Sequence, residues 1–189
     1  MYPVLNNKKK IVVIGGNAAG AAAAAKAKRF NPDLEVFMVE AGEYISVGSC
    51  ELPYLISGEI DDYKKIVFFD ANTFREKKGV DVFLKHRVVE VSPSKRELKV
   101  LNENGNEYKL KYDKLILTTG AQSKRFNECL DAKNVFNYKT INDYLSVKES
   151  LEKSTHKQIV VVGGGFIGLE VAEALNRVGV KVLLIEKSS

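Results

Sequence analysis

The same order of apolar and polar segments occurs near both ends of the chain. A short apolar run, Ile11–Ile14, is followed by a glycine-rich turn, an alanine-rich stretch and a second apolar run, Leu34–Val39. The order repeats in Ile159–Val162, a glycine-rich turn, an apolar stretch that stops at Gly179, and Val180–Ile185. Short continuous apolar runs are typical of strands buried on both faces, and alanine is the strongest helix former. The pattern therefore predicts two strand–helix–strand units in a Rossmann-like α/β fold.

Further helices and a β-meander are predicted around these units. The helices are expected at Ala21–Arg29, from near Cys50 to Gly58, at Ala71–Lys78, from the capping signal Thr140–Asp143 to Leu151, and at Leu169–Val178. Alternation of apolar and polar residues predicts strands at Val82–Leu84, Val88–Val91, Leu98–Leu101 and Tyr108–Leu110. Asn104-Gly105 is a strong hairpin signal, and Lys114–Leu117 returns to a buried-strand pattern. The meander is therefore expected as an insertion in the first α/β domain.

The glycine-rich turn of the second unit has the complete G-x-G-x-x-G spacing, with Gly163, Gly165 and Gly168. These glycines permit a tight turn, a close approach of the backbone to a pyrophosphate, and close packing of helix on strand. Glu186 follows at the end of the next strand, where a carboxylate accepts hydrogen bonds from a ribose and repels a 2′-phosphate. The unit is predicted to bind NADH in preference to NADPH, although Lys187 weakens that preference. The alternative is a turn that binds no nucleotide.

The turn of the first unit departs from this spacing, because Asn17 stands at the place of the second glycine. Asparagine tolerates unusual backbone angles, but its side chain restricts the approach of phosphates. Gly15 and Gly20 keep the first and third positions, and Glu40 ends the next strand. Two such units in one chain predict two bound dinucleotides.

Composition and charge narrow the class of protein. The 189 residues carry a net charge of +5, but the basic residues are scattered, so no nucleic-acid partner is expected, whereas anionic small ligands suit this charge. Two cysteines are not a disulfide framework, which predicts a reducing cytoplasm, and no cluster of metal ligands is present in the sequence. The glycines within Ile11–Ala25 favour a strand–turn–helix over a signal peptide, and no other apolar run approaches a membrane span.

Two further motifs carry a resemblance to a known family. The chain reads Leu-Ile-Leu-Thr-Thr-Gly-Ala at 115–121, and Ser46, Cys50, Pro53 and Tyr54 have the spacing S-x-x-x-C-x-x-P-Y. With the two dinucleotide units, these resemble the pyridine nucleotide-disulfide oxidoreductases, in particular the single-cysteine branch of coenzyme A-disulfide reductases, NADH oxidases and NADH peroxidases. The resemblance implies an FAD-binding domain (first part) at 1–121, a linker and connecting helix at 122–157, and an incomplete NAD(P)-binding domain at 158–189.

The resemblance also implies roles for individual residues. Cys50 is the expected redox-active thiol, at a helix N-terminus that favours the thiolate form, with a buried structural cysteine as the alternative; Cys129 is expected to be inert. Phe166 stands where a tyrosine often covers the flavin, and Glu170 matches a glutamate near the nicotinamide. The implied cofactor-binding residues are Gly15, Asn17, Ala18, Ala19, Gly20, Glu40, Ser46, Pro53, Val88, Val89, Thr118, Thr119, Gly120, Gly163, Gly165, Phe166, Ile167, Gly168, Glu170 and Glu186. Candidates for holding the phosphates of coenzyme A are Arg29, Lys64, Lys65, Lys77 and Lys78, although charge runs are usually solvated surface.

The activity implied by the resemblance is reduction of a disulfide, persulfide, peroxide or oxygen by NAD(P)H, through FAD and Cys50. The family's C-terminal dimerisation domain has no counterpart in these residues, so a longer parent protein is expected to be a homodimer. Two alternatives stay open. One is a reductase that passes electrons to rubredoxin or an iron–sulfur partner, with Cys50 incidental, and the other is a truncated, non-catalytic FAD-binding module.

Overall fold

The computed structural model of the protein describes residues 8–124, 127–129, 131–154 and 158–187. The chain forms two compact units. The first contains the described residues up to Val47 together with Val67–Ala121, and the second contains Gly48–Ile66 together with the described residues from Gln122 onward. The segment around Cys50 therefore belongs to the second unit, although most of its sequence neighbours belong to the first.

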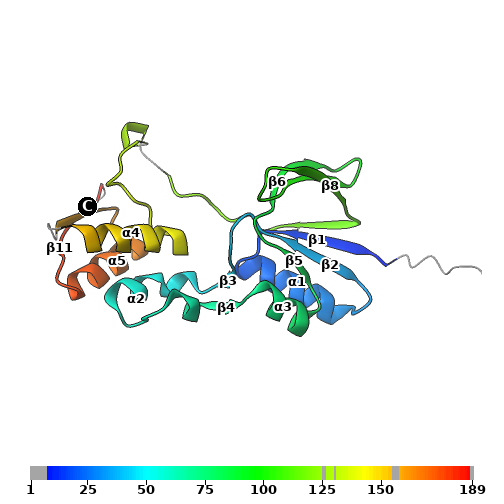
Figure 1. The fold of residues 1–189 in the computed structure, drawn as a ribbon, viewed down its shortest axis with the longest axis horizontal. Helices are drawn as coiled ribbons and strands as arrows, with labels where there is room; N and C mark the ends of the chain where they lie inside the picture. The colour runs from blue at the N-terminus through cyan, green and yellow to red at the C-terminus, as the bar shows by residue number, and fades with distance from the viewer. Residues whose placement is uncertain (1–7, 125–126, 130, 155–157, 188–189) are drawn as a thin grey trace, which may run out of the picture. The chain divides into compact units, whose positions relative to one another are not determined.

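A parallel sheet forms the centre of the first unit, with strand order β5–β2–β1–β9 (Figure 1). Its strands are β1 (Lys10–Ile14), β2 (Glu35–Val39), β5 (Asp81–Phe83) and β9 (Lys114–Leu117). Helix α1 (Ala18–Phe30) connects β1 to β2, and α3 (Ala71–Lys78) leads into β5. The α/β fold with a parallel sheet is the one that the apolar pattern predicted.

The two faces of this sheet are covered differently, which follows from the alternation of side chains along β1. Val13 is fully buried with Met38 and Phe74 on the face covered by α1 and α3. Val12 points to the other face and packs with Leu98 of the meander, both at 0% exposure. The strand is therefore buried on both sides, as a continuous apolar run requires.

Strand β5 corrects one prediction. It pairs in parallel with β2, with Val82 opposite Met38, so the assignment of Val82–Leu84 to the meander was wrong. Three alternating residues cannot by themselves distinguish an edge strand of a parallel sheet from a meander strand. The ring of Phe83 stacks on that of Phe37, with centroids 5.9 Å apart, and this contact joins β5 to the central sheet.

The meander has three antiparallel strands, β6 (Arg87–Ser92), β7 (Glu97–Leu101) and β8 (Glu107–Lys111), with a bulge between Val88 and Glu90. A second antiparallel pair, β3 (Ile45–Val47) and β4 (Val67–Phe69), was not predicted. The segment Gly48–Ile66 lies between these two strands in the sequence.

The second unit contains the parallel pair β10 (Gln158–Val162) and β11 (Lys181–Ile185), connected by α5 (Phe166–Arg177). Helix α2 (Leu52–Ser57) follows the 3₁₀ turn Ser49–Glu51 and packs against α4 (Ile141–Lys153) and α5. Single 3₁₀ turns lie at Tyr63–Ile66 and Asn127–Cys129. Helices α1 and α5 each begin three residues before the predicted Ala21 and Leu169, because the second half of each glycine-rich turn is already helical.

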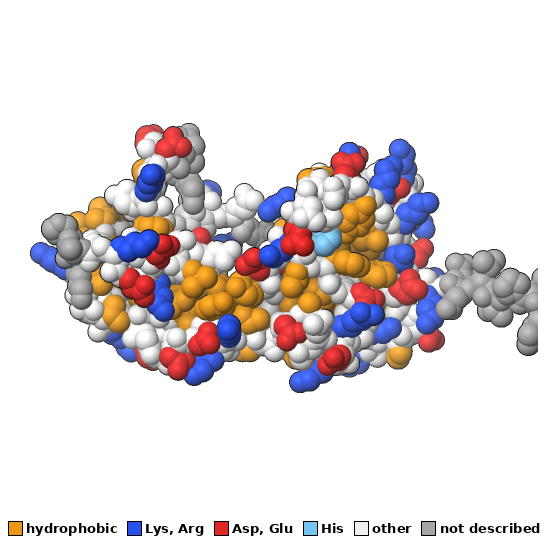
Figure 2. Space-filling model, viewed as in Figure 1, with side chains coloured by type: hydrophobic (Ala, Val, Ile, Leu, Met, Phe, Trp, Pro, Cys, Tyr) orange, Lys and Arg blue, Asp and Glu red, His pale blue; other side chains and the backbone are white. Residues whose placement is uncertain are grey.

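The charged side chains on the face drawn in Figure 2 are interspersed by sign. On the meander, oppositely charged side chains pair across strands, such as Lys99 with Glu107 at 3.2 Å and Lys109 with Glu97 at 3.0 Å. Among the helices that the structure describes, none is both long enough and apolar enough to cross a bilayer.

The cap of α3 generates a prediction about acid stability. The Asp70 carboxylate accepts hydrogen bonds from the backbone N–H of Thr73 at 2.8 Å and from its hydroxyl at 2.9 Å, and these bonds lower the pKa of Asp70. A lowered pKa in the folded state contributes stability above the ordinary value of about 3.9, and this contribution is lost as the pH falls through the folded value. Asp70→Asn keeps a capping oxygen that does not titrate. We expect its urea midpoint to fall less than that of the wild type between about pH 5 and about pH 2; equal falls would contradict the prediction.

Candidate dinucleotide sites and redox cysteine

The glycine-rich turn after β1 is closed by two backbone contacts that exclude a side chain. Gly15 has φ +98°, and a Cβ atom on it would lie 2.2 Å from the carbonyl oxygen of Thr118. A Cβ atom on Gly20 would lie 1.8 Å from the carbonyl oxygen of Gly15. Helix α1 therefore approaches the end of β1 as closely as backbone atoms permit.

The turn after β10 repeats this geometry. Gly163 has φ +108°, and a Cβ atom on Gly168 would lie 1.9 Å from the carbonyl oxygen of Gly163. Nothing lies within 4 Å of a Cβ atom built on Gly165, so the surface above the second glycine is open. This is the shape that lets a pyrophosphate approach the backbone.

Each turn also holds the carboxylate that ends the following strand. Oε2 of Glu40 accepts a hydrogen bond from the Gly16 N–H at 2.7 Å, and Oε1 accepts one from the Gly42 N–H at 2.6 Å. Oε2 of Glu186 accepts from the Gly164 N–H at 2.5 Å in the same way. The backbone thus fixes both carboxylates beside the start of the helix, where a ribose attached to a bound pyrophosphate would lie.

The N-termini of α1 and α5 are suited to an anion. Neither the Asn17 side chain nor the N-cap Gly165 caps its helix, and neither helix has an acidic residue in its first turn. Ala18, Ala19, Phe166 and Ile167 are exposed at these helix starts, and Phe166 is 88% exposed. N–H groups and the positive end of the helix dipole are therefore available to phosphates, and the residues present fit a dinucleotide at each turn.

The Asn17 side chain makes a hydrogen bond that a glycine at the second position of the motif could not make. Its Oδ1 accepts a hydrogen bond from the Val47 N–H at 3.0 Å, so the side chain is directed to β3. The neighbouring Ser46 N–H donates to the Gly16 carbonyl at 2.9 Å, and Ser46 has φ +52°, in the left-handed region. Two consecutive residues of β3 are thus attached to the turn.

The other residues implied for the first site surround this turn or lie in the meander. Thr118 Oγ1 donates to the Ile14 carbonyl at 2.7 Å and supports the turn from β9, while Thr119 and Gly120 are exposed. Val88 is half-buried next to the bulge, and Val89 is 46% exposed. Thr118 therefore stabilises the turn by a hydrogen bond from its side chain to the backbone of the turn.

Cys50 lies in the second unit, in the 3₁₀ turn before α2, and its side chain is exposed. The alternative of a buried structural cysteine is therefore wrong. Pro53 is buried in the first turn of α2, as expected of a residue with no N–H to satisfy. The Tyr138 hydroxyl donates to the Leu52 carbonyl at 2.7 Å, and burial raises the pKa of Tyr138 well above the usual tyrosine value, so this donor keeps its proton.

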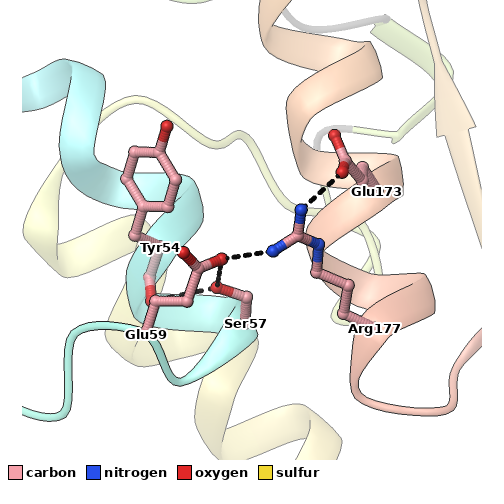
Figure 3. Close-up of polar contacts among 5 residues, drawn as sticks. All are labelled: Tyr54, Ser57, Glu59, Glu173 and Arg177. Carbon is pink, nitrogen blue, oxygen red and sulfur yellow. Dashed lines mark hydrogen bonds and ion pairs between the residues drawn. The ribbon is translucent and has the colours of Figure 1, made fainter.

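An ion-pair cluster joins the end of α2, the helix that follows Cys50, to α5 (Figure 3). Arg177 donates to Glu59 Oε1 at 2.6 Å and to Glu173 Oε1 at 2.8 Å, and Ser57 Oγ donates to the same oxygen of Glu59 at 3.1 Å. These residues and Glu170 line a shallow depression of about 90 Å³. Glu170 is exposed on α5, close in sequence to the second glycine-rich turn.

The basic residues suggested for coenzyme A are exposed and divided between the units. Arg29, Lys77 and Lys78 belong to the first unit, and Lys64 and Lys65 to the second. Lys65 pairs with Asp61 at 2.6 Å, while the ammonium groups of Lys77 and Lys78 lie 5.9 and 5.2 Å from the centroid of the Phe69 ring. Their role in binding stays a prediction.

The sequence analysis missed the backbone donors of both sites. Gly16, Gly42 and Gly164 present N–H groups to the two carboxylates, and Val47 presents one to Asn17. The doubled glycine at the start of each turn was a usable signal for the first and third of these. The sequence held no such signal for Val47, because a backbone N–H is present whatever the residue type.

Two strand–glycine turn–helix–strand units, each with a carboxylate fixed beside its turn, are typical of dinucleotide-binding α/β folds. The family model for the pyridine nucleotide-disulphide oxidoreductases matches residues 9–189. The chain belongs to this family.

Relatives of this chain include three proteins from different organisms. The NADH oxidase of Methanocaldococcus jannaschii is 30% identical over 84% of this chain and 36% of its own length. The NAD(P)H coenzyme A polysulfide/persulfide reductase of Pyrococcus horikoshii is 35% identical over 85% of this chain and 36% of its own length. The crystal structure of reduced CoADR-RHD of Bacillus anthracis superposes with a TM-score of 0.93 and 32% identity, over 96% of this chain and 33% of that one. The chain thus spans about a third of the length of these relatives.

The second turn generates a prediction with a built-in control. Gly168→Ala brings a Cβ atom against the Gly163 carbonyl at 1.9 Å, so we expect a loss of about 3 kcal/mol in the free energy of unfolding. Gly165→Ala has open space and φ −71°, so its stability should change by less than about 0.5 kcal/mol. The same methyl group stands where a pyrophosphate would approach, so Gly165→Ala should weaken NADH binding without unfolding the chain. Urea unfolding and NADH titration check both; equal stability losses would show that the turn geometry is wrong.

Proposed function

We propose that this chain is the FAD- and pyridine nucleotide-binding part of an NAD(P)H-dependent reductase that uses Cys50 as its only redox-active thiol. Residues up to 121 would hold FAD, and residues 158–189 would begin the site for NADH. The observation that carries the proposal is the repeated turn, with the Glu40 and Glu186 carboxylates held by backbone N–H groups at the same place in both units. The relatives named NADH oxidase and NAD(P)H coenzyme A polysulfide/persulfide reductase support it.

FAD, when bound, supplies a two-electron relay between a reduced pyridine nucleotide and a thiol. Gly15, Gly20 and Glu40 would hold its pyrophosphate and ribose, and Thr118 would keep the turn in shape. Gly163, Gly168 and Glu186 would do the same for NADH. Phe166 would lie against the second nucleotide, because it is exposed at the first position of α5.

Cys50 would carry out the thiol chemistry. Its thiolate attacks one sulfur of a disulfide, a Cys50–S–S bond forms, and the other half of the disulfide leaves as a thiolate. Two electrons and one proton delivered to this mixed disulfide restore the Cys50 thiolate and release the second half as a thiol. Exposure of Cys50 in the turn before α2 suits the attack, because a substrate must reach the sulfur in line.

Among acceptors, a low-molecular-weight disulfide or persulfide is favoured, with coenzyme A as the thiol. A relative that is 35% identical is named for coenzyme A and polysulfide or persulfide. The exposed lysines near Phe69 and at 64–65 would meet anionic phosphates. Both cysteines of the described chain are free, which fits a reducing compartment such as the cytoplasm. We propose that the parent protein is a homodimer.

The redox role of Cys50 is tested by substitution in the full-length parent protein. We expect Cys50→Ser to abolish NADH-dependent reduction of coenzyme A disulfide and any long-wavelength absorbance that depends on a thiolate beside the flavin. Cys129→Ser is the matched control and should retain both, because Cys129 lies outside the predicted site. Anaerobic spectra and disulfide turnover are the measurements. Full activity in Cys50→Ser would favour electron transfer to a protein partner, and failure of NADH to reduce the flavin would favour a non-catalytic FAD module.

The preference for NADH is tested at Glu186. Glu186→Gln retains an oxygen that can accept from the Gly164 N–H but removes the negative charge that would repel a 2′-phosphate. We expect the ratio of NADH to NADPH affinity to fall by about fivefold, the equivalent of about 1 kcal/mol. Stopped-flow titration with each nucleotide measures the ratio, and Glu173→Gln on the far end of α5 is the control. An unchanged ratio would remove Glu186 from the specificity site.

A further inference from the structure

The carbonyl group of Leu52, two residues after Cys50, accepts a hydrogen bond from a side chain outside its helix. The Tyr138 hydroxyl donates to this oxygen at 2.7 Å. Tyr138 and the segment Gly48–Ile66, which contains Cys50, belong to the same compact unit, so the bond lies within one unit. Burial raises the pKa of Tyr138, so the hydroxyl keeps its proton and remains a donor throughout the pH range in which a thiol is assayed.

Leu52 is held through its N–H, its side chain and its carbonyl group. Its N–H donates to the Ser49 carbonyl and closes the 3₁₀ turn that contains Cys50. Its side chain is 2% exposed, in a helix that packs against α4 and α5. Its carbonyl oxygen accepts from Tyr138. The short turn that carries Cys50 therefore ends at a residue that is fixed in three ways.

Tyr138 directly precedes a helix end that is itself capped. The N–H groups of Lys139 and Thr140 both donate to Asp143 Oδ2, at 3.0 and 2.8 Å, and the Asp143 N–H donates to Thr140 Oγ1 at 3.1 Å. This capping box fixes the chain immediately after Tyr138. The start of α4 thus provides the fixed point from which Tyr138 reaches the turn that contains Cys50.

Helix α2 depends on such contacts because it is short. Its six residues form fewer than two turns, and a helix of this length is not stable by itself. Beyond its last residue, Glu59 pairs with Arg177 at 2.6 Å (Figure 3). The Tyr138 bond acts at its first residue, Leu52. The two contacts hold opposite ends of the helix, and the end held by Tyr138 is the one next to Cys50.

We propose that Tyr138 is a positioning residue for Cys50, which directs the thiol for attack on a bound disulfide by fixing the turn through the Leu52 carbonyl. Cys50 is exposed, so its sulfur is accessible in any case. The bond acts on direction, because the attacking sulfur must approach along the axis of the sulfur–sulfur bond. This inference rests on the proposed function, because it assigns Tyr138 a part in the thiol chemistry of Cys50.

Two reagents separate direction from access in the full-length, FAD-containing protein, with its thiols reduced beforehand and NADH left out. Iodoacetamide is small and alkylates an exposed thiolate from any open side. Coenzyme A disulfide is bound and attacked in line, and each attack forms a mixed disulfide at Cys50 and releases one coenzyme A thiolate. Tyr138→Phe keeps the ring and removes the hydroxyl. Tyr144→Phe is the matched control, because it removes the hydroxyl of a second tyrosine, 4% exposed on α4, and leaves the bond from Tyr138 in place.

We expect Tyr138→Phe to slow the two reactions unequally. Release of coenzyme A should be about three- to tenfold slower than in the wild type, the effect of losing one hydrogen bond. Alkylation of Cys50 and reduction of the flavin by NADH should stay within about twofold of the wild-type rates, as should both thiol reactions in Tyr144→Phe. Stopped-flow detection of released thiol and mass spectrometry of the peptide that contains Cys50 measure the two rates.

The remaining outcomes overturn the inference and identify the reason. A change in alkylation as large as the change in coenzyme A release, or loss of bound flavin in Tyr138→Phe, would make the role of Tyr138 purely structural. A wild-type rate of release in Tyr138→Phe, with release abolished in Cys50→Ser, would remove the inference and leave the proposed function intact. Release that is absent in the wild type, or unchanged in Cys50→Ser, would remove the proposed function and this inference together.

Discussion

The contact between the Gly15 carbonyl and the α-carbon of Gly20 is the constraint on which the first unit depends. It brings the start of α1 against the end of β1, and the contact between Gly163 and Gly168 does the same in the second unit. Because the helix begins so close to the strand, its free N–H groups and the carboxylate of the next strand meet at one place. The geometry of both candidate nucleotide sites is a consequence of this packing, in which no side chain can be inserted.

The main elements of the fold were predictable from sequence because they follow from local rules. Continuous apolar runs gave β1, β2, β10 and β11, and the glycine spacing gave the turns between strand and helix. The short pair β3 and β4 was not predicted, since three residues are too few for a periodicity. Strand β5 was assigned to the wrong sheet because its partner, β2, is distant in sequence. Patterns of apolar and polar residues indicate which positions are buried, but they do not indicate which strands pair with each other in a sheet.

The candidate sites divide in a similar way. Glu40 and Glu186 were found from spacing, since a carboxylate at the end of a strand has one position relative to the turn. The task of Asn17 could not be found, because the bond to Val47 depends on the left-handed backbone of Ser46, which no motif encodes. For Cys50, sequence indicated the helix that follows it, and the structure added its exposure and the attachment of that helix to α5 through Arg177.

The grouping of Gly48–Ile66 with the second unit has a consequence for how the protein is made. Helix α2 buries Leu52, Leu55 and Ile56 and packs against α4 and α5, which begin only at Ile141 and Phe166. A ribosome adds about 5–20 residues each second, so this apolar helix waits several seconds for its packing partners to emerge. The first sheet also waits for β9, which starts at Lys114. Synthesis from the N-terminus therefore leaves the apolar face of the segment that contains Cys50 without its packing partners until α4 and α5 have been made.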